Sequence, residues 1–206
     1  MTPSQNITCQ TVTWSVGDTP LDHGPCVAAI GNFDGVHRGH ATVIAAAIDA
    51  ARAKGVAAAA VTFDPHPREF FRHEDAPFHL ADRAEKDRLL AALGLDRVIH
   101  VTFDDNLRCT DASAFVSDVL PALGVTDLFA GSDFAFGRGR GGDLDTINAI
   151  GSGIGISASA VSLMSDANSA VISSSRIRAA LQAGEVEQAA SMLGHDWAVT
   201  GVVQLG

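Results

Sequence analysis

Residues 31–40 (GNFDGVHRGH) have the residue types and the spacing best suited to phosphate chemistry. They follow a short apolar run, and Gly31 and Gly35 let the backbone approach a ligand closely. A helix is expected to open here, with His37 and His40 on one face of its first turn. The free N–H groups and partial positive charge of such a turn bind anions, and imidazoles can donate hydrogen bonds to phosphate oxygens. The alternative, a surface histidine pair that only caps a helix, is less favoured because the pair follows a buried strand and a glycine loop.

Residues 172–178 (ISSSRIR) indicate a second anion site. Three serines precede a predicted helix that contains two arginines, and a serine cap with open N–H groups and a guanidinium binds phosphate. A plain serine cap with solvated arginines explains this segment alone equally well. Its occurrence together with the histidine segment favours a shared phosphate-binding role.

Two further loops carry candidate ligand contacts. Residues 131–143 (GSDFAFGRGRGGD) combine glycine freedom with two arginines, and Asp133 could accept from a ribose hydroxyl; a flexible charged loop is the alternative. Residues 63–71 (FDPHPREFF) hold His66 between two prolines that stiffen the loop. The neighbouring phenylalanines could line a slot for a flat aromatic ligand, or they could be ordinary core residues.

The elements that must position these loops alternate along the chain. Apolar strand-like runs at 26–31, 56–63, 97–103, 127–131 and 156–164 alternate with helical patterns at 38–54, 82–93, 111–123, 143–150, 174–183 and 185–193. This order predicts an α/β fold, a doubly wound parallel sheet with helices on both faces. Such sheets bind ligands at the carboxyl ends of their strands, near the switch in strand order. The candidate loops follow the predicted strands and are expected to meet there.

Composition limits the classes of function. The chain has 206 residues, 47% hydrophobic and 18% charged, which suits one α/β domain with a substantial core. A net charge of −10 argues against a nucleic-acid or membrane-surface partner. No apolar run reaches the ~20 residues of a membrane helix, and the first residues lack the features of a signal peptide. We therefore expect a cytoplasmic protein with small-molecule substrates; the sequence leaves its oligomeric state open.

Together these motifs resemble those of a known family. His37-Arg38-Gly39-His40 matches the HxGH motif of the adenylyl- and cytidylyltransferase superfamily, and ISSSRIR resembles its partner motif. In order along the chain, GNFDGVHRGH, FDPHP, LADRAEKDRLLAALGLDRV, GSDFAFGRGRGGD and ISSSRIRAALQAGEVEQAASMLG resemble the N-terminal FMN adenylyltransferase domain of prokaryotic bifunctional riboflavin kinase/FAD synthetase. HxGH alone would indicate only the superfamily, whereas the later segments single out the flavin branch.

The resemblance implies a Rossmann-like HxGH nucleotidyltransferase fold and a reaction. AMP would pass from ATP to FMN in line, without a covalent intermediate, to give FAD and pyrophosphate. ATP with Mg²⁺ would be the substrate complex, with FMN and FAD as substrate and product, and no residue is expected to be a direct metal ligand; Asp34 and Asp143 are candidate outer contacts. The residues carried over by motif are His37, His40 and Arg178 as catalytic; Gly31, Asn32, Phe33, Gly39, Asp133, Arg140, Ser173 and Ser174 for ATP; and Pro65, His66 and Pro67 for the flavin.

The sequence also suggests an organisation. Residues 1–25 are expected to be a lead-in with room for one short strand, 26–194 the nucleotidyltransferase domain, and 195–206 the truncated start of a linker or C-terminal domain that opens with a strand. Riboflavin kinase activity is not expected from this chain alone, because the family's kinase domain is missing from it. Two other functions stay open: nucleotidyl transfer to another phosphorylated acceptor, and a non-catalytic remnant that binds flavin or nucleotide.

Overall fold

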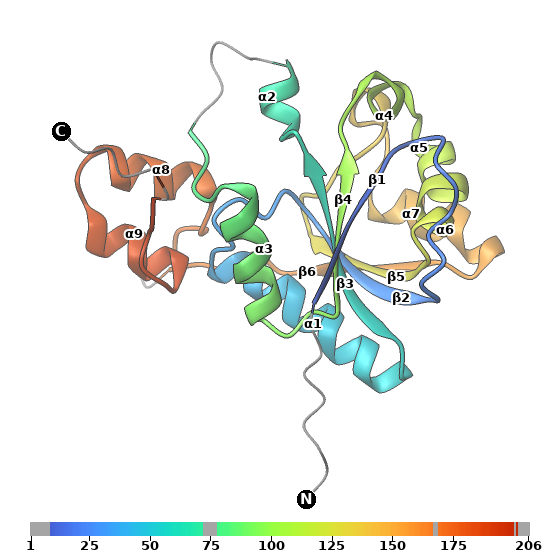
Figure 1. Ribbon diagram of the computed structural model, residues 1–206, viewed down its shortest axis with the longest axis horizontal. Coiled ribbons are helices and arrows are strands. Elements are labelled where there is room, and N and C mark those ends of the chain that lie inside the picture. The colour runs from blue at the N-terminus through green and yellow to red at the C-terminus, as the bar shows by residue number, and fades with distance from the viewer. Residues whose placement is uncertain (1–8, 72–77, 167–168, 200, 202–206) are drawn as a thin grey trace, which may run out of the picture.

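A single parallel sheet organises the chain (Figure 1). The computed structural model describes residues 9–71, 78–166, 169–199 and 201. Within them the sheet has six strands in the order β1-β4-β3-β2-β5-β6, and every neighbouring pair is parallel. The strands are β1 (Gln10–Trp14), β2 (Cys26–Ile30), β3 (Ala57–Asp64), β4 (Arg97–Thr102), β5 (Val125–Gly131) and β6 (Ser157–Val161).

Helices cover both faces of this sheet, which confirms the predicted doubly wound α/β fold. One face packs against α1 (Arg38–Lys54) and α3 (Arg83–Ala92), whose buried side chains form a cluster with alternate residues of the central strands. The other face packs against a second cluster supplied by short helices. These are α4 (Asp105–Cys109), α5 (Ala112–Ala114), the π-helix η1 (Phe115–Val119), α6 (Leu120–Ala122) and α7 (Leu144–Gly151).

A separate helical pair lies to one side of the sheet. Helices α8 (Ser174–Gln182) and α9 (Val186–Leu193) appear beyond α3 in Figure 1. Their apolar faces form a third cluster, which also contains Leu80 and Ile172 and does not include a strand residue. This pair therefore reaches the sheet mainly through the loops at its edge.

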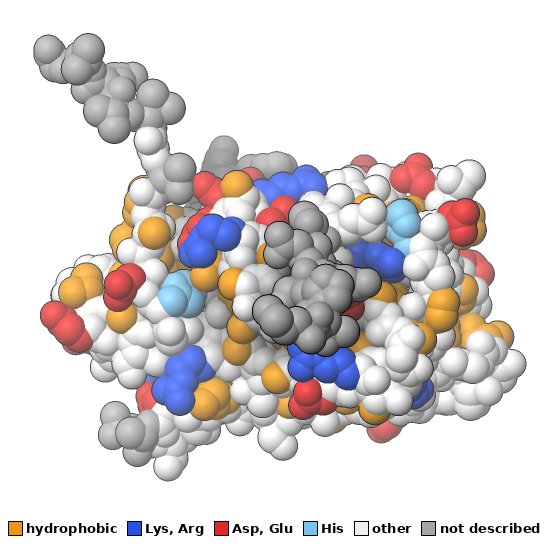
Figure 2. Space-filling view, turned by 60° about the horizontal axis from the view of Figure 1, so that its bottom comes forward, with side chains coloured by type: hydrophobic (Ala, Val, Ile, Leu, Met, Phe, Trp, Pro, Cys, Tyr) orange, Lys and Arg blue, Asp and Glu red, His pale blue; other side chains and the backbone are white. Residues whose placement is uncertain are grey.

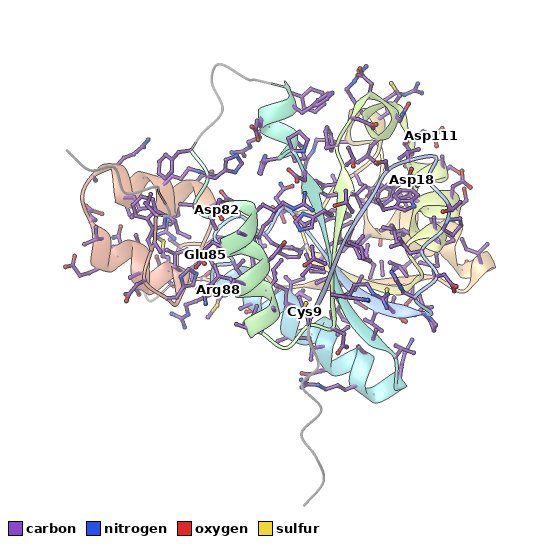
Figure 3. All side chains as sticks on the ribbon, viewed as in Figure 1. Cys9, Asp18, Asp82, Glu85, Arg88 and Asp111 are labelled. Carbon is purple, nitrogen blue, oxygen red and sulfur yellow. The ribbon has the colours of Figure 1, made fainter. Side chains whose placement is uncertain are left out.

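Local chemistry explains the element ends. The alanine-rich run of α1 stops at Gly55, whose left-handed conformation (φ 68°) favours glycine at a helix C-terminus. Asp82 and Asp111 cap α3 and α5 by accepting N–H bonds from Glu85 and Ala114 (Figure 3). Further along α3, Arg88 donates two bonds of 2.7 Å to the Glu85 carboxylate. These caps fix where each helix begins relative to the strand before it.

Several elements differ from the expectation. The short strand for which residues 1–25 left room is present as β1, and it pairs with β4 at the edge of the sheet. The helix predicted over 111–123 is interrupted by η1, and the strand predicted over 156–164 is only five residues long. Helices α2 (Pro67–Phe71) and α4 fall in segments where no helix was expected. The described part of 195–206 is irregular and does not form the expected strand; residues 200 and 202–206 lie outside the description.

The surface carries mixed charge. In the face shown in Figure 2, Lys and Arg side chains are interspersed with Asp and Glu. Among the described helices, none is long and apolar enough to cross a membrane.

Candidate active site

The loop that follows β2 lies where the strand order reverses. Strand β2 pairs with β3 on one side and β5 on the other, so residues 31–37 sit at the switch point. Two adjoining cavities open there. The first, which we call the histidine cavity, has a volume of about 320 Å³, and the second, the aromatic cavity, about 860 Å³. The residues that line both are Gly31, Asn32, His66, Arg68, Asp133 and Phe134.

His37 and His40 form a stacked pair at the start of α1. Their ring centroids are 3.5 Å apart with planes at 16°, and Phe33 meets the His40 ring edge-on at 5.3 Å. The His37 Nδ1 accepts from the His40 backbone N–H at 3.3 Å and caps the helix. In the neutral ring its proton is therefore on Nε2, free to be donated. A Cβ at Gly39 would lie 3.2 Å from the His37 ring, which favours glycine there.

Burial holds both histidines neutral. It lowers the pKa of His37 to about 4. The pKa of His40 is lowered well below its usual value, chiefly by burial and then by the nearby His37 and Lys86 charges. The His40 Nδ1 is buried and has no hydrogen-bond partner among the described residues. At pH 7 the pair thus offers hydrogen-bond donors to an anion without prior positive charge.

Arg178 reaches the histidine cavity from α8, where its guanidinium group is paired with the Asp34 carboxylate. The two side chains form a buried ion pair across 144 positions of sequence. The Arg178 Nε also donates to the Phe78 carbonyl at 2.7 Å. The Asp34 Oδ1 accepts from the backbone N–H groups of Leu80 (2.9 Å) and Ala81 (3.2 Å). Arg178 is therefore held in the cavity wall by Asp34, which itself lines the cavity.

The serine motif ties α8 to the histidine loop. Ser173 caps α8 by accepting from the Arg176 N–H at 3.4 Å. The Ser174 hydroxyl donates to the Asp34 carbonyl at 3.1 Å. Both serines line the histidine cavity, while Arg176 is turned to Asp166. The structure thus brings the two predicted anion motifs to one cavity.

The glycine–arginine loop (residues 131–143) contributes different residues to the two cavities. Asp133 is exposed and lines both cavities, whereas Arg140 lines only the aromatic one, where it adopts a positive φ of 59°. A Cβ at Gly137 would lie 2.8 Å from the Ala112 backbone, so this loop is pressed against α5. Asp143, the other candidate outer metal contact, instead caps α7 with Thr146 in a reciprocal capping box.

The segment expected to face a flavin, residues 65–67, lies partly at the wall that the two cavities share. His66 lines both cavities, Pro67 begins α2 and lines the aromatic cavity, and Pro65 lines neither. Burial lowers the pKa of His66 to about 4, and its Nδ1 accepts from the Arg68 N–H at 3.0 Å. The aromatic residues of this cavity are Phe63, Phe71, Phe103, Phe115, Phe134 and Phe136.

Some lining residues were not predicted. Phe103 directly follows β4, so the rule that ligands bind beyond strand ends would have identified it. Arg68 and Arg108 lie on the short helices that the sequence did not indicate. Lys86 lines neither cavity and was also not predicted. Its Nζ donates to the Thr62 hydroxyl at 3.3 Å, and that hydroxyl donates to the Asn32 carbonyl at 3.1 Å. Within the described ranges, no group of three or more His, Cys, Asp or Glu side chains could hold a metal ion.

Comparison with known proteins decides the family. The model of the family described as FAD synthetase matches residues 19–176. The chain belongs to the FAD synthetase family. Over 186 residues it is 39% identical to a bifunctional riboflavin kinase/FMN adenylyltransferase of Pseudomonas fluorescens, covering 90% of this chain and 59% of that protein. It is 34% identical over 191 residues to an FAD synthetase of Listeria monocytogenes, covering 90% and 75% respectively.

A further relative and one solved structure are also similar to this chain. The FAD synthetase family chain is 37% identical over 182 residues to a bifunctional riboflavin kinase/FMN adenylyltransferase of Escherichia coli K12, of which it covers 58%. It thus spans about three-fifths of two of these relatives. A crystal structure of a protein named macrolide-efflux protein, from Streptococcus pneumoniae, superposes with a TM-score of 0.78 over 91% of this chain and 60% of that one, at 24% identity. At that identity the superposition shows the Rossmann-like fold alone.

Proposed function

We propose that this chain is an FMN adenylyltransferase, which transfers AMP from ATP to FMN to give FAD and pyrophosphate. One observation carries the proposal: two cavities of different chemistry share a wall at the switch point of the sheet. One is lined by paired histidines, serines and an arginine, and the other by six phenylalanines. This combination suits a reaction that joins a nucleoside triphosphate to a phosphate ester that carries a large aromatic ring. Membership of the FAD synthetase family supports the same reaction.

The cavity chemistry suggests where each substrate binds. The triphosphate of MgATP suits the histidine cavity, where the first turns of α1 and α8 supply N–H groups and helix-dipole charge. The isoalloxazine ring of FMN suits the aromatic cavity, since flat rings pack well on phenylalanines. The FMN phosphate would then lie near the shared wall, beside His66 and Asn32. The arginines of the aromatic cavity, Arg68, Arg108, Arg138 and Arg140, would offset its charge.

The proposed reaction needs positioning more than proton transfer. A phosphate oxygen of FMN attacks the α-phosphorus of ATP, the bond from that phosphorus to the bridging oxygen breaks, and pyrophosphate leaves with the electron pair. The attacking phosphate is already anionic at pH 7, so no strong general base is required. His37 and His40 would donate hydrogen bonds to the charge that develops around the α-phosphorus. Mg²⁺, bound to the triphosphate, would neutralise the leaving group.

The first test is to measure FAD formation. The purified chain with FMN, ATP and Mg²⁺ is expected to yield FAD and pyrophosphate, separated by chromatography. His37→Asn and His40→Asn are each expected to lower kcat about a hundredfold, the loss of ~3 kcal/mol typical of one such donor. His23→Asn is the control, because His23 is exposed and lines neither cavity. Wild-type turnover in both active-site variants would contradict the proposal.

The same assay separates the two other functions. Transfer to another phosphorylated acceptor, such as a phosphopantetheine or a nicotinamide nucleotide, would give its dinucleotide product and no FAD. Binding of both FMN and ATP with no pyrophosphate release would indicate a non-catalytic binding protein. The six phenylalanines beside the histidine cavity favour the flavin over an acceptor without a large ring.

A further inference from the structure

The segment that follows α9 folds back over the loops that hold the histidine cavity. We call His195–Asp196–Trp197 the strap. The His195 Nε2 lies 3.0 Å from the Gly35 carbonyl, and the Trp197 indole N–H donates to the Leu80 carbonyl at 2.9 Å. Neither contact is local, since they join positions 160 and 117 residues apart. The strap therefore connects two segments of chain that themselves meet at Asp34.

Trp197 acts on the segment that fixes Arg178. Residues Phe78, Leu80 and Ala81 hold the ion pair: Phe78 accepts from the Arg178 Nε, while Leu80 and Ala81 donate to Asp34. The Trp197 ring lies 6.2 Å from the Phe78 ring, and its N–H bonds the Leu80 carbonyl. Trp197 thus contacts this segment at Phe78, which bonds Arg178, and at Leu80, which bonds Asp34.

His195 acts on the loop that carries the histidines. Gly35 has φ +76° and is tightly enclosed, because a Cβ there would lie 2.8 Å from Leu80 Cβ and 3.2 Å from Leu193 Cδ2. The His195 ring bonds the carbonyl of this residue, between Asp34 and the helix that starts after His37. The loop is therefore fixed by packing from two sides and by a hydrogen bond from the strap.

The geometry points to the strap as a positioning device for the phosphate site: His195 and Trp197 hold the Gly35 and Leu80 carbonyls and so keep Asp34 and Arg178 in place for a triphosphate. Neither residue lines either cavity, so they act through others rather than on the substrate. The inference rests on the proposed function only in taking the ligand of the histidine cavity to be the triphosphate. It adds a specific consequence, that phosphate affinity depends on residues outside the site.

The decisive variants remove one donor each and preserve packing. Trp197→Phe keeps an aromatic ring against Phe78 and loses the N–H; because 37% of Trp197 is exposed, the change leaves the core intact. His195→Leu loses the ring donor to Gly35, and His195→Gln keeps an amide donor. Val199→Ala is the matched control, since Val199 lies in the same segment and is 73% exposed.

Binding is measured by calorimetry with ATP, inorganic tripolyphosphate and adenosine, alongside thermal melting. We expect Trp197→Phe and His195→Leu to weaken ATP and tripolyphosphate about fivefold, the scale of one net hydrogen bond. Adenosine affinity and the KM for FMN should stay unchanged, and His195→Gln should recover most of the loss. A purely structural role would lower the melting temperature and the active fraction without this selectivity.

Each outcome decides the inference. Unchanged tripolyphosphate affinity in both donor-loss variants, or equal losses for adenosine and tripolyphosphate, would overturn it. The proposed function is judged separately: wild-type chain that binds tripolyphosphate but makes no FAD would contradict the activity, and the variants would still test the strap.

Discussion

The neutrality of the histidines that line the histidine cavity is a property of single residues with measurable effects. Burial lowers the pKa of both His37 and His66 to about 4. Each ring therefore stays unprotonated in the folded protein at pH values where an exposed histidine, with a pKa near 6.5, would be charged. A phosphate that enters the cavity would therefore meet imidazole N–H donors that are uncharged and do not repel one another.

This difference predicts a pH dependence of stability. Between about pH 6.5 and pH 4 the unfolded chain binds protons at these histidines and the folded chain does not, so the free energy of unfolding falls as the pH falls. Each such histidine contributes at most about 1.4 kcal/mol per pH unit. Urea denaturation of ligand-free protein at pH 7, 6 and 5 should show the decline, and His37→Asn should make it less steep.

The control for this measurement is His23→Asn, which replaces an exposed histidine and should keep the wild-type slope. An identical slope in His37→Asn would mean that His37 is protonated in the folded protein, contrary to its burial.

At the scale of elements, the short helix α2 has the clearest role. It presents Phe70 and Phe71 to Phe103, with ring centroids 5.3 and 5.8 Å from the Phe103 ring. Phe71 and Phe103 line the aromatic cavity, and Phe71 keeps 60% of its surface exposed. An exposed phenylalanine at a cavity rim is available to a ligand without loss of core packing.

We therefore expect Phe71→Ala to raise the KM for FMN several-fold and leave the KM for ATP unchanged, because only the aromatic cavity loses a wall. Steady-state FAD formation with each substrate varied in turn measures both constants. Val186→Ala, an exposed apolar residue on α9, is the control. Equal increases in both KM values would contradict the separate placement of the two substrates.

Sequence patterns predicted the helices and strands better than they predicted the contacts between distant side chains. Helix α1 was predicted with its observed bounds, since an alanine-rich run and Gly55 define it locally. The π-helix η1 depends on a shift of backbone hydrogen bonds within a continuous helical pattern. Helices α2 and α4 are too short for hydrophobic periodicity to reveal them. The approach of His37 to the serine motif followed from the strand-end rule. The buried ion pair of Arg178 with Asp34 could not be predicted in this way, because a single sequence does not indicate which distant charged residues are in contact.

At the scale of the whole molecule, we expect a ligand to stabilise the α8–α9 pair more than the helices that cover the sheet. Its apolar cluster is separate from the two that cover the sheet, and its links to the histidine loop include Arg178 and Ser174. A ligand that binds between α1 and α8 stabilises the arrangement that joins them, by about 2.7 kcal/mol at a hundredfold excess over Kd.

Hydrogen exchange should reveal this link. Saturating ATP is expected to slow amide exchange in α8 more than in α7, which packs on the other face of the sheet. Mass spectrometry of peptides from both helices, with adenosine as the control ligand, gives the comparison. Equal protection of α7 and α8 would mean that the ligand stabilises the molecule uniformly.

The Asp34–Arg178 pair also has a consequence for synthesis on the ribosome. Asp34 is made early, and its partner emerges 144 residues later, after all six strands. A chain that ends before α8 lacks the cation that pairs with Asp34, so we expect this carboxylate to oppose the binding of a triphosphate there. On the proposed function, we therefore expect full affinity for nucleotide only after α8 has docked, so that ATP binding by the purified protein would also report that this helix is in place.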